Sequence, residues 1–195
     1  CNTATTAAVT LLRETWPELP ILGMEPAVKP AATATRSGVV GVLATQATFS
    51  SPRYSELMGR YGYHINVLED PCLGLVERIE AGEVDTPGTS TFLQDILQPM
   101  LDQGADAIVL GCTHYPLVRP LIEEIVGPEV EVIDPAPAVA DHLRHRLERN
   151  ELLNPGNSAP WFRFLFTGSV ETGTKIVQEY LDIKGPATIE AGTLG

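Results

Sequence analysis

Short apolar runs that alternate with amphipathic segments constrain the fold of this 195-residue chain more than any other feature. The apolar runs lie at residues 19–23, 39–44, 64–68, 107–110, 130–133 and 162–166. Their length and their β-branched content are typical of buried strands. Around and between them, helical spacing of apolar residues occurs at residues 4–14, 52–60, 73–81, 90–103, 116–126, 136–149 and 170–181. This alternation predicts an α/β fold with parallel sheets of the doubly wound type.

Polar residues that directly follow a predicted strand indicate where a ligand binds. In open parallel sheets the ligand lies beyond the carboxyl ends of the strands. Three segments have this character: residues 1–3 (Cys-Asn-Thr), residues 45–51 after the run at 39–44, and residues 111–114 (Gly-Cys-Thr-His) after the run at 107–110. We therefore look for the chemistry of the chain in these segments.

A thiol at a strand end is the main chemical signal. Cys112 precedes a predicted helix that opens at Pro116, and nearby amides and the positive helix end can favour a thiolate. His114 lies two residues further on and could hold or relay a proton. The alternative is a buried structural cysteine, which is the more common role of a lone cysteine.

A second thiol has the same setting. Cys1 is followed by polar residues and then by the helical run at 4–14. Two opposed thiols suit a 1,1-proton transfer, in which one thiolate removes a Cα proton and the other thiol returns one to the opposite face. The alternative is that Cys1 has no chemical role and only marks where the sequence begins.

Charge and cysteine content exclude several classes of protein. The net charge of −12 would repel a nucleic-acid backbone, and no apolar stretch reaches the roughly 20 residues that span a bilayer. Three cysteines without a spacing pattern argue against a disulfide framework and indicate a reducing compartment. We expect a cytoplasmic protein without nucleic-acid or membrane partners.

Metal and cofactor motifs are weak or missing. Cys72, Cys112 and His114 could be considered as zinc ligands, but zinc sites usually bring ligands in close pairs, and Cys72 stands apart. The sequence contains no glycine-rich dinucleotide or phosphate loop, and its lysines lack a recognisable Schiff-base context. We therefore predict neither a metal nor a cofactor.

Four segments together resemble the glutamate racemases of the aspartate/glutamate racemase superfamily. They are residues 1–4 (Cys-Asn-Thr-Ala), 43–54, 74–77 (Gly-Leu-Val-Glu) and 111–116, where Gly-Cys-Thr-His is the most specific element. The resemblance covers nearly the whole chain. Aspartate racemases of the superfamily typically carry Glu at the position of His114, which favours glutamate as the substrate.

The resemblance implies a role for each candidate residue. Cys1 and Cys112 would be the two acid/base thiols, one for each enantiomer, and His114 would assist Cys112. The substrate-binding residues would be Asn2, Thr3, Thr45, Thr48, Glu77 and Thr113. For Thr45 and Thr48 the alternative is a hydroxyl-rich turn, and for Glu77 it is an exposed helical charge.

The resemblance also implies two similar α/β domains with the active site between them. Residues 1–25 and 135–195 would be parts of the first, discontinuous domain, and residues 26–134 would form the second. An Asp-Ser pair and a Tyr-Gly pair of the family precede the first thiol, so we expect the first domain to lack an N-terminal segment. The Ala-Cys-Pro of the family appears here as residues 70–72 (Asp-Pro-Cys), which suggests a structural role for Cys72.

The resemblance further implies that the chain uses neither pyridoxal phosphate nor metal, forms a homodimer and supplies D-glutamate for peptidoglycan. Two other hypotheses stay open at this point. The chain could be a racemase of the same superfamily that acts on aspartate or a related acid, or a truncated chain that is catalytically silent.

Overall fold

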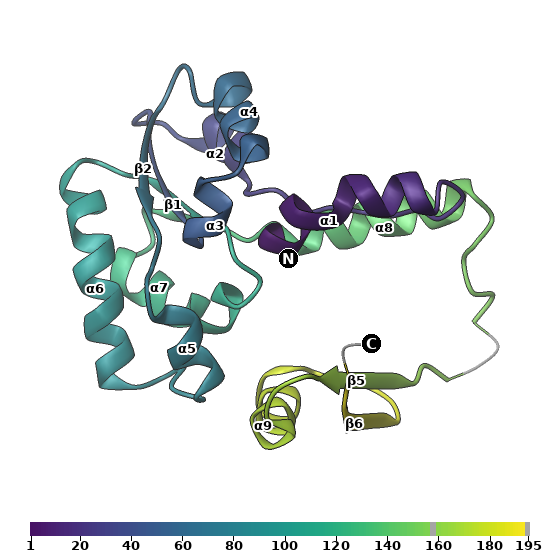
Figure 1. Cartoon of the computed structure of the whole chain (residues 1–195). Helices are drawn as coiled ribbons and strands as arrows, with labels where there is room; N and C mark the ends of the chain where they lie inside the picture. Colours follow the sequence, from purple (N-terminus) through teal and green to yellow (C-terminus); the bar gives the residue numbers. More distant parts are fainter. Residues whose placement is uncertain (157–158, 194–195) are drawn as a thin grey trace.

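The computed structural model describes residues 1–156 and 159–193 and contains two parallel sheets (Figure 1). The larger sheet has the strand order β2-β1-β3-β4, and the smaller sheet pairs β5 with β6. All neighbouring strands run parallel. The strands are β1 (Val39–Leu43), β2 (Asn66–Asp70), β3 (Ala107–Leu110), β4 (Glu131–Ile133), β5 (Phe162–Phe166) and β6 (Ala187–Ala191). The predicted α/β class with parallel sheets is confirmed.

Helices connect successive strands, as parallel pairing requires. The helices are α1 (Asn2–Thr15), α2 (Val28–Ala34), α3 (Gln46–Phe49), α4 (Pro52–Tyr61), α5 (Leu75–Glu80), α6 (Pro87–Asp102), the 3-10 helix η1 (Tyr115–Val118), α7 (Arg119–Val126), α8 (Ala136–Arg149) and α9 (Val170–Tyr180). Hydroxyl side chains cap several of them. Ser51 accepts a hydrogen bond from the Tyr54 amide at the start of α4, and Thr86 does the same for the Thr89 amide in α6.

The larger sheet is buried on both faces because successive side chains of a strand point to opposite sides. Val40 and Val42 of β1 pack with residues of α2 and α4 in one apolar cluster. Ile108 and Leu110 of β3 belong to a second cluster, which includes residues of α5, α6, η1 and α7. Two layers of helices therefore hold the strand ends of this sheet in place.

The predicted strand at residues 19–23 is wrong. No helix or strand is present between the end of α1 and the start of α2. Pro17 and Pro20 lack the amide hydrogens that a strand ladder needs. The segment instead packs on α1, where Arg13 Nε donates to the Ile21 carbonyl at 3.1 Å. The sequence patterns also gave no signal for α2, α3 and β6.

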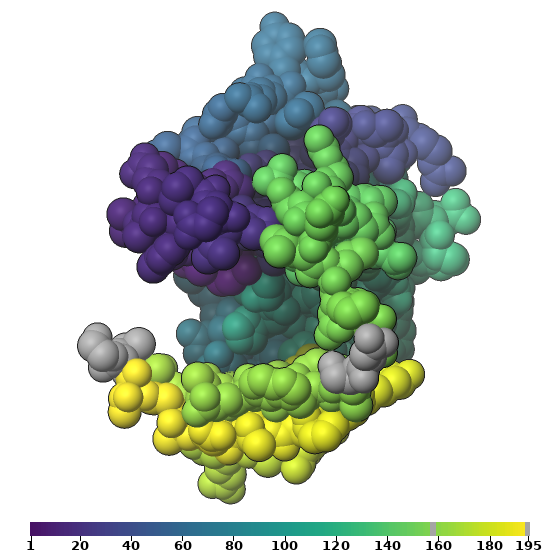
Figure 2. All heavy atoms as spheres, turned by 90° about the vertical axis from the view of Figure 1, so that its right-hand side faces the viewer, coloured from purple at the N-terminus to yellow at the C-terminus, as the bar shows by residue number. Residues whose placement is uncertain are grey.

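Helices α1 and α8 lie side by side, apart from the helices that cover the larger sheet (Figures 1 and 2). Helix α8 contains no buried residue, although its apolar positions follow helical spacing. Among the residues that the structure describes, no helix has the length and apolar character needed to cross a membrane.

Asp106 fixes the turn that leads into β1. Its carboxylate accepts hydrogen bonds from the Thr35 hydroxyl and from the backbone amides of Arg36 and Ser37. Desolvation alone would raise the pKa of Asp106, but these hydrogen bonds outweigh it and lower the pKa from 3.8 to about 2. The carboxylate is therefore bound more favourably in the folded chain than in the unfolded chain.

We expect Asp106→Asn to lower the free energy of unfolding at pH 7 by about 2 kcal/mol. Because the folded-state pKa is depressed, this stabilisation is present above the unfolded pKa of 3.8 and is lost as the pH falls toward 2. Urea unfolding of the wild type and the variant at pH 7 and pH 3 measures it. Asp95→Asn is the control, because Asp95 is exposed. Equal losses of stability in both variants at pH 7 would contradict the assignment.

Candidate active site

The candidate site lies at the carboxyl ends of β1 and β3. These strands pair in parallel with Leu43 opposite Leu110, so the residues that follow them emerge at the same edge of the sheet. The Gly111 amide donates to the carbonyl of Leu43 at 2.6 Å. Thr45 and Cys112 therefore both lie just beyond this edge, where α/β sheets bind ligands.

Gly111 allows the two strand ends to approach this closely. A Cβ at this position would lie 2.6 Å from the carbonyl oxygen of Leu43 and 2.7 Å from the Cβ of Ala44. Both obstacles belong to the backbone or to a short side chain, so neither can move aside cheaply. The glycine of the Gly-Cys-Thr-His motif thus sets the position of the thiol that follows it.

We expect Gly111→Ala to displace Cys112 and to lower the free energy of unfolding by about 1–3 kcal/mol. If Cys112 is a reacting group, turnover should fall at least about tenfold as well, since a misplacement of about 1 Å is costly in catalysis. The matched control is Gly59→Ala in α4, where a Cβ meets nothing within 4 Å. A Gly111→Ala protein as stable as the wild type would refute this packing argument.

Cys112 is a nearly buried thiol beside a histidine. Its Sγ lies 3.8 Å from His114 Nδ1. Burial raises the pKa of Cys112, while the backbone amides of His114 and Tyr115 oppose that rise. The thiol is therefore protonated at rest and has a base at hand to receive its proton.

Glu80 completes this arrangement from the other side of the ring. Its Oε1 lies 3.1 Å from His114 Nε2, at the end of α5. A carboxylate on one ring nitrogen fixes the orientation of the imidazole. Glu77, the residue chosen from the sequence, is exposed, and its side chain makes no hydrogen bond or ion pair with any described residue. Glu77 and Glu80 are three residues apart on one helix, so they lie on the same face. This spacing in the sequence could have identified Glu80 as a second candidate.

The start of α1 is tied to the residue before Cys112. Asn2 is 3% exposed, and its Nδ2 donates to the Gly111 carbonyl at 2.6 Å. Asn2 directly follows Cys1, and Gly111 directly precedes Cys112. This hydrogen bond therefore joins the two segments that carry the thiols. Cys1 itself is exposed, and Asn2 Oδ1 is buried without a hydrogen-bond donor in the described part of the chain.

Three hydroxyl groups form a chain next to these residues. Thr3 Oγ1 lies 2.9 Å from Thr45 Oγ1, which lies 3.1 Å from Thr48 Oγ1. The structure thus brings together threonines from α1, from the end of β1 and from α3. Thr113 is exposed next to Cys112. Hydroxyls and amides of this kind are suited to bind the charged groups of a small polar ligand.

Cys72 lies in the core. It is 2% exposed, its amide donates to Asp70 Oδ1 at 2.7 Å, and burial together with the charge of Asp70 raises the pKa of its thiol. All three cysteines are free. Over residues 1–156 and 159–193, no group of three or more His, Cys, Asp or Glu side chains is placed to hold a metal ion.

Comparison with known proteins finds racemases both by family and by sequence identity. Residues 1–143 match the Asp/Glu/Hydantoin racemase family. The chain is 48% identical over 177 residues to the glutamate racemase of Stutzerimonas stutzeri, covering 91% of this chain and 66% of that protein. It is 51% identical over 159 residues to the glutamate racemase of Pseudomonas aeruginosa, covering 82% of this chain and 60% of that protein.

A solved structure of a glutamate racemase has a similar fold. The glutamate racemase of Francisella tularensis, in complex with D-glutamate, superimposes with a TM-score of 0.78 at 27% identity, covering 100% of this chain and 71% of that chain. The chain thus spans less than two thirds of the length of the curated relatives named above.

Proposed function

Because the chain belongs to the Asp/Glu/Hydantoin racemase family, we propose that it interconverts L- and D-glutamate by a two-thiol 1,1-proton transfer without a cofactor. The observation that carries this proposal is the hydrogen bond from Asn2 to Gly111, which links the segments of the two thiols. The identity to glutamate racemases over most of the chain supports glutamate as the substrate. The product would supply D-glutamate for peptidoglycan.

In this mechanism His114 takes the proton of Cys112, and Glu80 holds the imidazole in position. The Cys112 thiolate then removes the Cα proton from one face of the substrate. The thiol of Cys1 donates a proton to the opposite face, which inverts the configuration. For the other enantiomer the roles of Cys1 and Cys112 are exchanged.

The remaining predicted site residues would bind the substrate. We assign Asn2, Thr3, Thr45, Thr48 and Thr113 to its ammonium and carboxylate groups. The unpaired Oδ1 of Asn2 supports this assignment, because a buried acceptor without a donor is rare and an ammonium group could supply one. We place Glu80 rather than Glu77 beside the reacting groups, on the strength of its 3.1 Å contact with His114.

We also propose the domain organisation that the sequence suggests. Residues 1–25 and 135–195 would be parts of one α/β domain and residues 26–134 would form the other, with the reaction between them. The larger sheet lies within the second range and the smaller sheet within the first. We further propose that the protein is a homodimer, as the family resemblance implies. We place it in the cytoplasm, since the mechanism needs two reduced thiols.

Circular dichroism of L-glutamate and of L-aspartate tests the proposal. The assay uses this chain and a completed chain, in which it is joined to the segments of the Stutzerimonas stutzeri relative that have no counterpart in it. We expect the completed chain to abolish the optical signal of L-glutamate faster than that of L-aspartate. Faster loss of the optical signal with L-aspartate would show that aspartate, and not glutamate, is the substrate. No loss of signal with either acid would overturn the proposed function.

A further inference from the structure

Helix α9 connects the smaller sheet to the part of the chain that carries His114. It packs against β6 of the smaller sheet and against α5. Figure 1 shows β5, β6 and α9 as a unit that stands apart from the larger sheet. Among the described residues from 159 to 193, Tyr180 is the only hydrophobic side chain that packs against the apolar cluster of α5, α6, η1 and α7. The contact between α9 and α5 therefore links the two units.

Two side chains of α9 reach Gly82, which lies two residues beyond the end of α5. The Tyr180 hydroxyl donates to the Gly82 carbonyl at 3.4 Å. The Lys175 side chain lies against Gly82, because a Cβ there would be only 2.8 Å from its Cε. Gly82 has a φ of +79°, in the left-handed region that favours glycine, and its amide donates to the Ile79 carbonyl at 2.9 Å. The turn that ends α5 is thus covered by α9.

Glu80 is the last residue of α5, so its position depends on this turn. Its side chain is 53% exposed, and that of His114 is 33% exposed. A surface contact between two such side chains is weak by itself, and the ends of helices fray. Glu80 and Lys175 line the same hollow between α5 and α9. The 3.1 Å contact between Glu80 and His114 is therefore supported from the side by α9.

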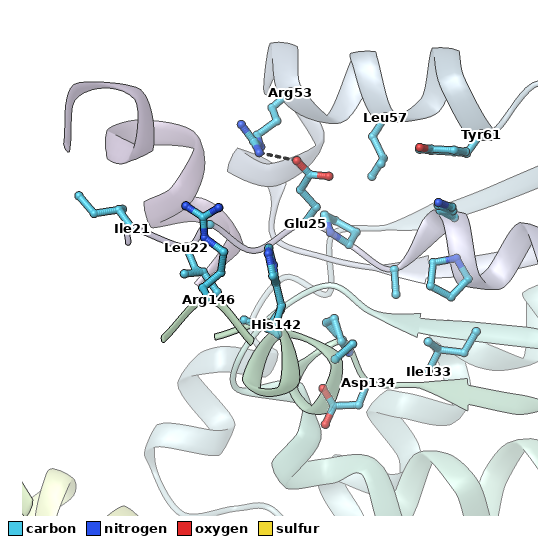
Figure 3. A pocket seen from close by; sticks show the side chains of 18 of the residues that line it. Ile21, Leu22, Glu25, Arg53, Leu57, Tyr61, Ile133, Asp134, His142 and Arg146 are labelled. Atoms are coloured by element: carbon cyan, nitrogen blue, oxygen red, sulfur yellow. Dashed lines mark ion pairs between the residues drawn. The ribbon is translucent and has the colours of Figure 1, made fainter. Parts of the chain in front are cut away.

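The contact is separate from other features of the molecule. The cavity in Figure 3 lies between α1, α4 and α8, and neither Glu80 nor any residue of α9 lines it. Val177 of α9 is 4% exposed but belongs to neither apolar cluster of the larger sheet. Helix α9 thus offers one buried side chain outside those clusters, Val177, and one that joins them, Tyr180.

We propose that Tyr180 is a positioning residue for the reaction, which acts through α5 and Glu80 on His114. It fastens the turn that ends α5, so that Glu80 stays within hydrogen-bond distance of the imidazole and the imidazole stays beside Cys112. The inference rests on the proposed function and deepens it, because it makes proton transfer at Cys112 dependent on the domain that contains α9.

Steady-state kinetics of the completed chain is the first test. Tyr180→Ala should lower kcat about tenfold with little change in KM, since a small displacement of the reacting groups is costly while the substrate contacts are kept. Tyr180→Phe keeps the ring and should retain kcat within about threefold, because it loses only one long hydrogen bond. With Glu80→Gln already present, Tyr180→Ala should lower kcat by less than about a further twofold, because the residue through which it acts is gone. Equal losses of kcat with and without Glu80→Gln would overturn the proposal.

Proton–carbon NMR of the histidine rings tests the same link without turnover, in the 195-residue chain. The signals of His114 are identified by their loss in His114→Gln. We expect Tyr180→Ala to move them, as Glu80→Gln does, and Val177→Ala to leave them in place although it removes a buried group from the same helix. Tyr180 is only partly buried and ends α9, so its variant should fold.

The outcomes separate this inference from the proposed function. Unmoved His114 signals in Tyr180→Ala, or equal movement in Val177→Ala, would reject the positioning role. Movement in Tyr180→Ala alone, in a chain whose completed form does not racemise glutamate, would support the positioning of His114 and reject only the proposed function.

Discussion

Replacing Cys112 by alanine is expected to lower kcat for glutamate racemisation by at least about a thousandfold in both directions. In one direction the substrate loses the base that removes its Cα proton, and in the other it loses the acid that returns one. We do not expect His114 to substitute, because its Nδ1 lies 3.8 Å from the position of the deleted sulfur. Circular dichroism of the completed chain, started from L-glutamate and then from D-glutamate, measures both rates.

Cys72→Ala is the matched control for this variant. Cys72 is also a buried, free thiol, and it has no histidine partner: its amide and its Sγ hydrogen-bond with Asp70. We expect it to retain kcat within a few-fold while it loses some stability, as deletion of a small buried group does. A Cys112→Ala enzyme that keeps more than about a tenth of wild-type kcat would remove Cys112 from the reaction.

Glu80→Gln should lower kcat by about a hundredfold with little change in KM. The glutamine keeps the shape of the side chain but replaces the carboxylate that lies 3.1 Å from His114 Nε2, so the imidazole is held less firmly beside Cys112 and proton transfer becomes less favourable. A change confined to kcat indicates an effect on the reacting groups, because loss of substrate contacts would also raise KM. Steady-state kinetics with both enantiomers resolves the two constants.

Glu77→Gln removes the same charge from the same helix. Glu77 is exposed and has no partner among the described residues, so its variant should have nearly wild-type kinetics. If Glu77→Gln loses activity while Glu80→Gln does not, the assignment made from the sequence motif is right and the one made from the geometry is wrong.

The central strands of the larger sheet, β1 and β3, were predictable because each is a buried apolar run with periodic helices beside it. Strand β2 lies two residues later than the predicted run at 64–68, since it is only partly buried and includes polar residues. The segment at 19–23 was wrongly predicted because its apolar content resembles a strand, while strand formation also needs a neighbour and free amides, which Pro17 and Pro20 reduce. Helix α2 was missed since it is short and contains Pro30, and α3 is a single turn.

Part of the candidate site was predictable for a similar reason. The thiol, His114 and the threonines directly follow strands or begin a helix, so their positions follow from the sheet. The choice between Glu77 and Glu80 depends on the rotation of α5 about its axis, which the motif does not determine.

The most direct test of the two-thiol mechanism is the fate of the Cα proton in D₂O. The completed chain is incubated with L-glutamate, and proton NMR follows the Cα signal of each enantiomer after separation. We predict that newly formed D-glutamate carries deuterium at Cα, because its proton comes from the second thiol and not from the substrate. D-glutamate that retains the original proton, or formation of D-glutamate that survives Cys112→Ala, would contradict the mechanism.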